Sequence, residues 1–159
     1  MRAQTAAILE LALVSCWIGG ALLLATVVAP AAFAALPSRT LAGAVVGRVL
    51  PALFYAGILI GIVVLATELS GGRRGVLAAR ILGAAALALS CAIAQFVVGP
   101  RIARLRESIG GPLEALAADD ARRAAFGRLH AFSVGWLALG GVAAVIVMLS
   151  AAHAARKLP

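Results

Sequence analysis

The polar residues that could carry chemistry are few, and most of them lie in one interval, residues 100–136. His130 and Ser133 lie three residues apart where this interval leads into an apolar run, and Arg101 begins a basic run at its other end. An imidazole at the edge of an apolar helix can bind a metal or haem or carry a proton, and ionisable groups inside membranes are functional candidates. The alternative is a histidine at a helix start, bonded to the backbone or to Ser133. We take His130, Ser133 and Arg101 as the candidate functional polar cluster.

Two carboxylates accompany the apolar runs. Glu10 lies inside the first run and Glu68 lies near the end of the second. A charge in lipid is costly unless it is paired, so we expect both to pair with Arg73, Arg74 or Arg80. A proton site shared by the two carboxylates requires that their helices meet, which the sequence leaves open. Glu10 and Glu68 are therefore candidate intramembrane carboxylates.

The remaining reactive groups give weaker signals. Cys16 and Cys91 lie inside apolar runs, where a thiol packs as a small hydrophobe. A disulfide or a pair of soft-metal ligands is the alternative, although Cys-x-x-Cys spacing is missing. The sequence contains no recognisable nucleophile and base, nucleotide-binding loop or carboxylate pair of the kind that soluble enzymes use. We therefore expect a non-enzymatic protein, assign no cofactor and leave any metal unspecified.

The composition indicates the environment of these residues. Of the 159 residues, 64% are hydrophobic and 13% are charged, and the mean hydropathy is +1.08, whereas soluble domains contain about 45–50% apolar and about 25% charged residues. A soluble fold of this length cannot bury so much apolar surface, so we predict an integral membrane protein. The net charge of +8 comes mostly from arginines beside the apolar runs, where arginines contact anionic lipid headgroups. We expect the lipid bilayer and these headgroups as partners, and no nucleic acid.

Four apolar runs are each long enough to cross a hydrocarbon core, which takes about 20 helical residues. We predict an all-α integral membrane protein in a single domain of residues 1–159. The expected architecture is a four-transmembrane-helix bundle with helices at about 6–29, 49–69, 76–99 and 129–152.

The longest connector, residues 101–127, is predicted to be an amphipathic helical segment between the third and fourth helices. Ile102, Leu105 and Ile109 recur at helical spacing, with arginines between them. Such a segment lies on the membrane surface or against the connector that follows the first helix.

Prolines and glycines give further local predictions. Pro30 disfavours continuation of the first helix, and Pro51 is expected in the first turn of the second, where a missing N–H does little harm. Gly57-x-x-x-Gly61 would let a neighbouring helix approach closely, unless these are simply the glycines that are common in membrane helices.

Short similarities suggest two related hairpins. Residues 27–30 are similar to 97–100, and residues 47–50 are similar to 127–130. An axis along the membrane normal would relate the hairpins. Chance similarity in a sequence rich in Val, Gly and Arg is the alternative.

The basic residues are almost equally divided between the two sides of the membrane, so the positive-inside rule barely decides the orientation. The dense basic turn at residues 71–75 favours cytoplasmic termini. We predict a location in the bacterial cytoplasmic (inner) membrane with both termini in the cytoplasm.

Several short motifs occur in a fixed order: Trp17-x-Gly19, Val28-Ala29-Pro30-x-x-Phe33-x-x-Leu36, Ala42-Gly43-x-Val45-x-Gly47, Pro100-x-x-x-x-Leu105-Arg106 and Phe126-x-x-Leu129-His130-x-x-Ser133. Together they resemble the transmembrane-protein-205-like family, a domain of unknown function (domain of unknown function 4149), over nearly the whole chain. The resemblance implies four membrane helices and no established reaction. It also implies an asparagine about one turn after Ser133, where this chain has Gly135-Trp136-Leu137.

Two classes of function remain. The first is a non-enzymatic bundle that assists the movement or tolerance of a small solute or metal, or that scaffolds a membrane partner or a second copy of itself. The second is a membrane haem- or metal-binding redox protein that uses His130, because a single histidine can hold a haem iron. The second class is weakened by the position of the only other histidine, His153, near the opposite membrane face.

Overall fold

The computed structural model describes residues 2–70 and 77–156, and within them the secondary structure is helical. The predicted basic turn at residues 71–75, which contains Arg73 and Arg74, lies outside the described residues. The α-helices are α1 (Arg2–Leu23), α2 (Ala29–Ala35), α3 (Arg39–Ser70), α4 (Leu77–Ile93), α5 (Gly99–Ile109) and α6 (Ala121–Arg156). One π-helical turn (Leu24–Val28) joins α1 to α2, a second (Ala94–Val98) joins α4 to α5, and a 3₁₀ turn (Leu113–Ala115) precedes α6.

The predicted all-α membrane architecture is confirmed. In the described ranges, four continuous helical segments are long and apolar enough to cross a membrane: Thr5–Ala35, Arg39–Ser70, Ala78–Ile109 and Ala121–His153. Their outward-facing side chains are apolar as well, and Leu59, Leu82 and Leu149 are each more than 60% exposed. Lipid solvates such a surface, whereas soluble proteins rarely expose large continuous apolar areas. The chain is an integral membrane protein.

Prolines do not end the membrane helices. α2 contains Pro30 near its start, and α5 contains Pro100 in the same position. A π turn precedes each proline. In a π turn a backbone N–H donates to the carbonyl five residues earlier instead of four, as the Ala29 N–H does to the Leu24 carbonyl. A proline has no N–H to donate, and a local π adjustment lets a helix in lipid continue past it. The expectation that the first helix ends at Pro30 is therefore wrong.

The second and fourth membrane helices begin earlier than predicted. α3 begins at Arg39, which places Pro51 in its interior rather than in its first turn. Most of residues 101–127 is helical, because α5 extends the third membrane segment and α6 begins at Ala121. Only residues 110–120 form an irregular connection there.

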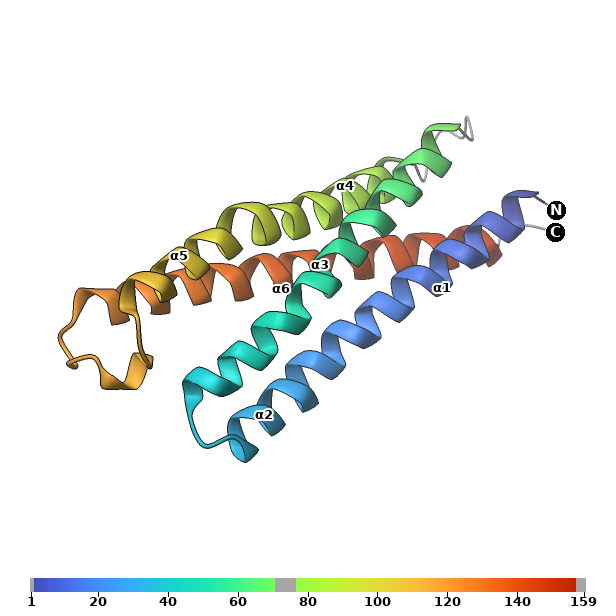
Figure 1. The fold of residues 1–159 in the computed structure, drawn as a ribbon. Helices are drawn as coiled ribbons and strands as arrows, with labels where there is room; N and C mark the ends of the chain where they lie inside the picture. The colour runs from blue at the N-terminus through green and yellow to red at the C-terminus, as the bar shows by residue number, and fades with distance from the viewer. Residues whose placement is uncertain (1, 71–76, 157–159) are drawn as a thin grey trace.

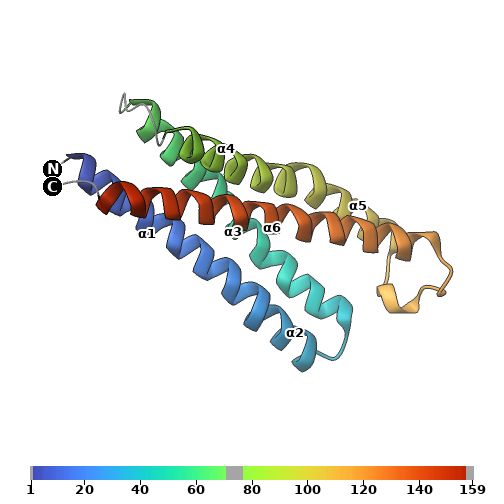
Figure 2. The ribbon, with the colours of Figure 1, turned by 180° about the vertical axis from the view of Figure 1, so that it is seen from behind.

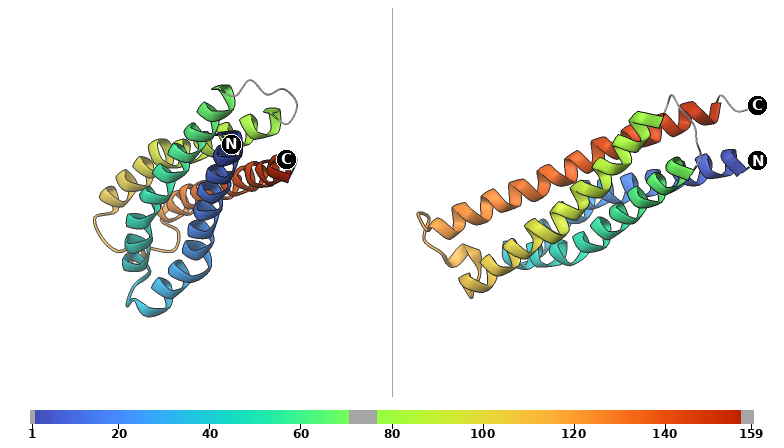
Figure 3. Two further views of the ribbon diagram at one scale, coloured as in Figure 1. Left: turned by 90° about the vertical axis from the view of Figure 1, so that its right-hand side faces the viewer. Right: turned by 90° about the horizontal axis from the view of Figure 1, so that it is seen from above.

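The helices form an elongated bundle with both chain termini at one end and the α2–α3 and α5–α6 connections at the other (Figure 1). α6 lies between α1 and α4 (Figure 2), and α3 packs against α4. Seen from above, the long helices run in similar directions (Figure 3). We call the end formed by residues 5–10, 67–70, 78–80 and 150–153 the terminal end, and the end formed by residues 30–48 and 99–130 the loop end. At the loop end, α2 and α3 diverge from α5 and α6 (Figure 1).

Small residues let α3 and α4 approach closely in the middle of the bundle. A Cβ atom at Gly57 would lie 2.5 Å from the Cys91 sulfur, and one at Gly61 would lie 2.7 Å from the Ala84 carbonyl oxygen. No side chain fits at these distances without movement of the neighbouring helix. The prediction that Gly57-x-x-x-Gly61 permits a close approach is confirmed, as expected for helices that associate by packing in lipid.

Candidate functional site

A buried polar cluster joins three membrane helices at the terminal end. Arg80 of α4 forms ion pairs with Glu10 of α1 and Glu68 of α3, the second with 2.7 Å between Nη2 and Oε1. The Thr67 hydroxyl also donates a hydrogen bond to the Glu10 carboxylate. Glu10 and Arg80 are 3% and 7% exposed. The prediction that both carboxylates pair with Arg73, Arg74 or Arg80 is confirmed for Arg80.

This terminal cluster contains one guanidinium and two carboxylates, so its formal charge is negative when all three groups are ionised. The Arg80 Nε is buried and has no hydrogen-bond partner among the described residues. The shared guanidinium brings the two carboxylates into one site, which is the condition that a shared proton site requires. The cluster also ties α1, α3 and α4 together, because removing one partner would leave a buried charge uncompensated.

A groove of about 870 Å³ lies at the loop end, between the diverging helices. α3, α6 and the α4–α5 segment each contribute one face to it. Leu50 and Phe54 of α3 and Val134 and Leu137 of α6 supply much of its apolar lining. Its volume falls within the range of about 300–1,000 Å³ that ligand sites usually have.

Two of the three residues of the predicted polar cluster line this groove. His130 and Ser133 are lining residues, whereas Arg101 is an exposed residue of α5 outside the lining. The His130 ring stacks on Phe126, with 6.4 Å between ring centroids and 3° between ring planes. Over residues 5–70 and 78–153, no hydrogen bond joins His130 to Ser133. The imidazole therefore faces the groove as a stacked ring.

Arg106 is a groove residue that the sequence analysis named only within a family motif and did not select for the candidate site. Its Cζ lies 5.4 Å from the centroid of the Phe126 ring, so Phe126 contacts both Arg106 and His130. Its guanidinium also reaches α3, where a Cβ at Gly43 would lie 3.0 Å from Nη2 and one at Gly47 would lie 3.7 Å from Nη1. The four-residue spacing of Phe126 and His130, and of Gly43 and Gly47, was the available signal, because such pairs share a helix face.

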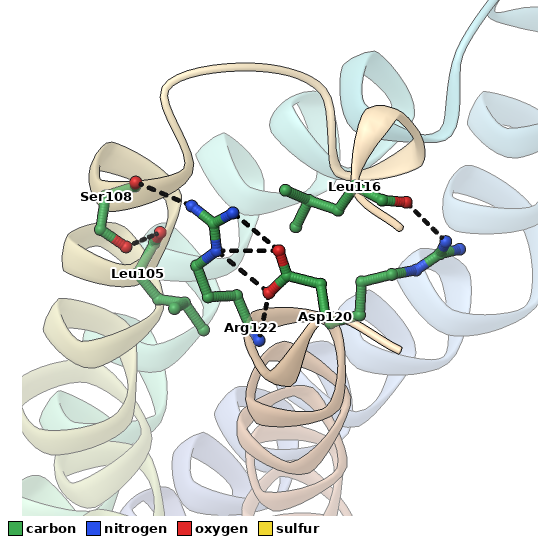
Figure 4. A network of polar contacts seen from close by, with 6 residues as sticks. Leu105, Ser108, Leu116, Asp120 and Arg122 are labelled. Atoms are coloured by element: carbon green, nitrogen blue, oxygen red, sulfur yellow. Dashed lines mark hydrogen bonds and ion pairs between the residues drawn. The ribbon is translucent and has the colours of Figure 1, made fainter. Parts of the chain in front are cut away.

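Hydrogen bonds hold the connection of residues 110–120 against α5 and α6 (Figure 4). The Asp120 carboxylate caps α6 by accepting the backbone N–H of Arg122 at 2.8 Å, and it pairs with the Arg122 guanidinium at 2.7 Å. The same guanidinium donates to the Ser108 carbonyl at the end of α5, at 3.4 Å. The side-chain hydrogen bond from Arg122, with its backbone N–H, lowers the pKa of Asp120 to about 2.

A second set of bonds ties this connection to the start of α3. The Glu114 carboxylate accepts the Thr40 hydroxyl at 2.6 Å and the Thr40 N–H at 2.9 Å, and the Leu113 N–H donates to the Thr40 hydroxyl at 3.1 Å. The bond from the Thr40 hydroxyl is the main reason that the pKa of Glu114 lies below its usual value. Glu114 therefore lines the groove, and its carboxylate oxygens already accept hydrogen bonds from Thr40.

Within the described ranges, no group of three or more His, Cys, Asp or Glu side chains is placed to hold a metal ion. Cys16 lies on the exposed side of α1 and Cys91 is buried in the core, and both are free. His130 and His153 lie on the same helix, about 35 Å apart at 1.5 Å per residue. The two histidines therefore cannot bind the same haem iron.

A family model for a domain of unknown function (DUF4149) matches residues 12–110. This range includes the whole of α3, α4 and α5, and with them the α3 and α5 faces of the groove. Neither a curated protein sequence nor a solved structure matches the chain.

Proposed function

The chain belongs to the DUF4149 family, a domain of unknown function, and from that premise we propose that it is a non-enzymatic membrane protein that binds an amphipathic small solute in the loop-end groove and assists its movement. The observation that carries this proposal is the groove itself, which combines an apolar lining with arginines and hydrogen-bonding groups. Such a combination suits a molecule with one apolar part and one polar part. The transmembrane-protein-205-like name stays a prediction.

The position of the groove supports exchange with the membrane. α3 and α6 expose large apolar side chains beside it, including Val45, Val49 and Phe132. An amphipathic solute in the bilayer could reach the groove without leaving an apolar environment. His130 and Ser133 would then contact the solute directly, which fits their selection as candidates from the sequence.

We also propose an orientation for the protein. Ile102 and Leu105 of α5 are half-buried and Arg101 and Arg104 are exposed, so α5 is suited to the boundary between the hydrocarbon core and the headgroups. We therefore propose that α5 forms the amphipathic part of the segment predicted at residues 101–127. The bacterial cytoplasmic membrane with cytoplasmic termini remains the proposed location.

Photolabelling tests the proposal. Full-length protein in nanodiscs would be exposed to a phosphatidylcholine that carries a diazirine in its acyl chain, and the labelled peptides would be mapped. We expect labelling of α3 and α6 at the groove, lost in Gly47→Leu, because this leucine would fill part of the groove while its Cβ meets Arg106 only at 3.7 Å.

Gly127→Leu is the matched control, since a Cβ there meets nothing within 4 Å and Gly127 does not line the groove. Equal loss of labelling in both variants, or labelling confined to the outer helix faces, contradicts the proposal. An absorption spectrum of the same sample checks the alternative, because a Soret band that disappears in His130→Ala would replace solute binding with haem binding.

A further inference from the structure

Arg106 occupies an unusual position for a charged side chain. It is half-buried in the groove, between the glycine face of α3 and the ring of Phe126. In the described part of the chain, its guanidinium forms no ion pair and donates no hydrogen bond. Five N–H donors are therefore directed into a largely apolar space without an acceptor.

Three other arginines near the ends of the bundle each have an acceptor for their terminal guanidinium nitrogens. Arg80 meets two carboxylates, Arg122 meets Asp120, and Arg123 donates to the Leu116 carbonyl at 3.0 Å. A guanidinium in a partly desolvated site is stabilised by an anion that accepts its paired donors, and carboxylate and phosphate fit this planar fork best. The contact with Phe126 compensates only part of the lost hydration. Arg106 thus lacks the anion that its environment requires.

The charges around Arg106 do not supply that anion. The groove lining contains three guanidinium groups, those of Arg39, Arg106 and Arg123, against one carboxylate, that of Glu114. The Glu114 oxygens already accept two hydrogen bonds from Thr40. The groove therefore has an excess of positive charge that would attract an anionic ligand.

The shape of the groove distinguishes a lipid from a small soluble anion. On α3 the lining runs from Arg39 at the loop end to Phe54, and on α6 from Arg123 to Leu137. Each stretch rises about 21–23 Å along its helix. Both lead from the arginines toward the middle of the membrane and become apolar on the way. A phospholipid in a leaflet has the same order of parts, with phosphate at the surface and acyl chain inward.

We propose that the groove binds an anionic phospholipid, with its phosphate on the Arg106 guanidinium and an acyl chain along Leu50, Phe54 and Leu137. This inference rests on the proposed function, because it names the class of solute that the same groove takes. Arg39 and Arg123 line the loop end of the groove and add positive charge there. Basic sites between membrane helices bind anionic headgroups in this way.

The test compares two photolabelled lipids with identical diazirine acyl chains, phosphatidylglycerol and phosphatidylcholine, in nanodiscs of unlabelled phosphatidylcholine. We expect the anionic probe to label the groove peptides about fivefold more than the zwitterionic one, the preference that one favourable cation contact provides. In Arg106→Gln the ratio should fall to about one. Arg106→Lys keeps the charge but loses the paired donors, so an intermediate ratio is expected.

Arg104→Gln is the matched control. Arg104 lies on the same helix, is exposed and donates only to the Pro100 carbonyl, at 3.3 Å, so the lipid preference should persist in this variant. Thermal unfolding of each variant confirms that it is folded.

The outcomes separate this inference from the function on which it rests. Equal groove labelling by both lipids, unchanged in Arg106→Gln, would leave solute binding standing and overturn the anionic ligand. Absence of groove labelling by either lipid would overturn both. A loss of preference in Arg104→Gln as large as in Arg106→Gln would reduce the effect to general surface attraction. Competition by inorganic phosphate as effective as by unlabelled phosphatidylglycerol would show that the ligand is a free anion and overturn the lipid.

Discussion

The two ends of the bundle each contain an arginine within the helix packing, and the two arginines have opposite surroundings. At the terminal end, Arg80 is buried and shares its charge with Glu10 and Glu68. At the loop end, Arg106 is half-buried beside Phe126 and has no anion among the described residues. In the first arrangement the protein itself supplies the counter-ions, whereas in the second we propose that a ligand supplies the anion. The terminal cluster therefore ties α1, α3 and α4 together, and the loop end is where we propose binding.

The two halves of the chain share structural features at a constant spacing. The π turns Leu24–Val28 and Ala94–Val98 lie 70 residues apart and each precedes a proline. Glu10 and Arg80 are separated by the same 70 residues and pair with each other. The 70-residue spacing is also that of the similar segments 27–30 and 97–100, and it would place opposite charges at equivalent positions. The duplication of a helical hairpin stays a prediction. Two related hairpins could thus be joined at one end while diverging at the other.

The largest expected effect is that of Arg80→Ala. This change would leave two buried carboxylates without their shared cation, and removing one partner of a buried ion pair typically costs about 3–5 kcal/mol. We expect a corresponding fall in the free energy of unfolding in detergent. Arg106→Ala should change it by about 1 kcal/mol or less, because the contact with the Phe126 ring is the one printed interaction of its side chain that is lost within the described chain. A similar cost for both variants would contradict the division between the two ends.

A smaller effect is expected from one substitution made at two glycines of α3. Gly61→Leu should destabilise by about 1–3 kcal/mol, because its Cβ would meet the Ala84 carbonyl at 2.7 Å and the backbone of α4 cannot move away easily. Gly47→Leu, on the same helix, should be nearly neutral, since it points into the groove. Thermal unfolding of the two variants measures the difference. Equal melting temperatures would show that the loop end is packed as tightly as the middle of the bundle.

The sequence was sufficient for the membrane architecture, because the length and composition of an apolar segment determine whether it inserts. It was less informative about where helices end. Pro30 was expected to end the first helix, but in lipid an unbonded backbone is so costly that the helices continue past Pro30 and Pro100 with π turns. The pairing of Glu10 and Glu68 with Arg80 was predictable for a related reason, since charges inside a membrane must find partners.

The candidate site was predictable only in part. His130 and Ser133 could be selected because polar groups are rare in this chain, and both line the groove. Arg106 could not, because its position depends on the angle between α3 and α5, which brings Gly43 to its guanidinium. Arg101 resembles Arg106 in sequence context but lies outside the groove lining. Helix orientation separates these two arginines, and a single sequence does not contain it.

A third prediction concerns the packed middle of the bundle, which links the two ends. The Trp17 indole donates its Nε1–H to the Leu53 carbonyl at 2.8 Å, between α1 and α3. Trp17→Phe keeps an aromatic ring and removes this bond, which in membrane proteins is worth about 0.6 kcal/mol on average. We expect a small decrease in thermal stability with no change in the phosphatidylglycerol preference. Trp136→Phe is the control. A change in lipid preference in Trp17→Phe would contradict this expectation and show that packing in the middle of the bundle affects lipid binding in the groove.

The smallest expected effect is a pH-dependent change in stability that arises at the loop end. The hydrogen bonds and charge of Arg122 lower the pKa of Asp120 to about 2, against about 3.9 for a free aspartate. Because the folded pKa is the lower one, this stabilisation is fully present above about pH 4 and disappears as the pH falls through about 2. Asp120 lies at the surface, where ion pairs contribute little, so the change should be slight.

Asp120→Asn isolates this contribution from that of the other carboxylates. Its melting temperature should lie below that of the unmodified protein at pH 5, and the two should converge as the pH approaches 2. Equal melting temperatures at every pH across this range would mean that Asp120 acts only as the cap of α6, which an asparagine side chain can also provide. A convergence accompanied by lower phosphatidylglycerol labelling would instead show that the 110–120 connection, held by Asp120, helps to shape the groove.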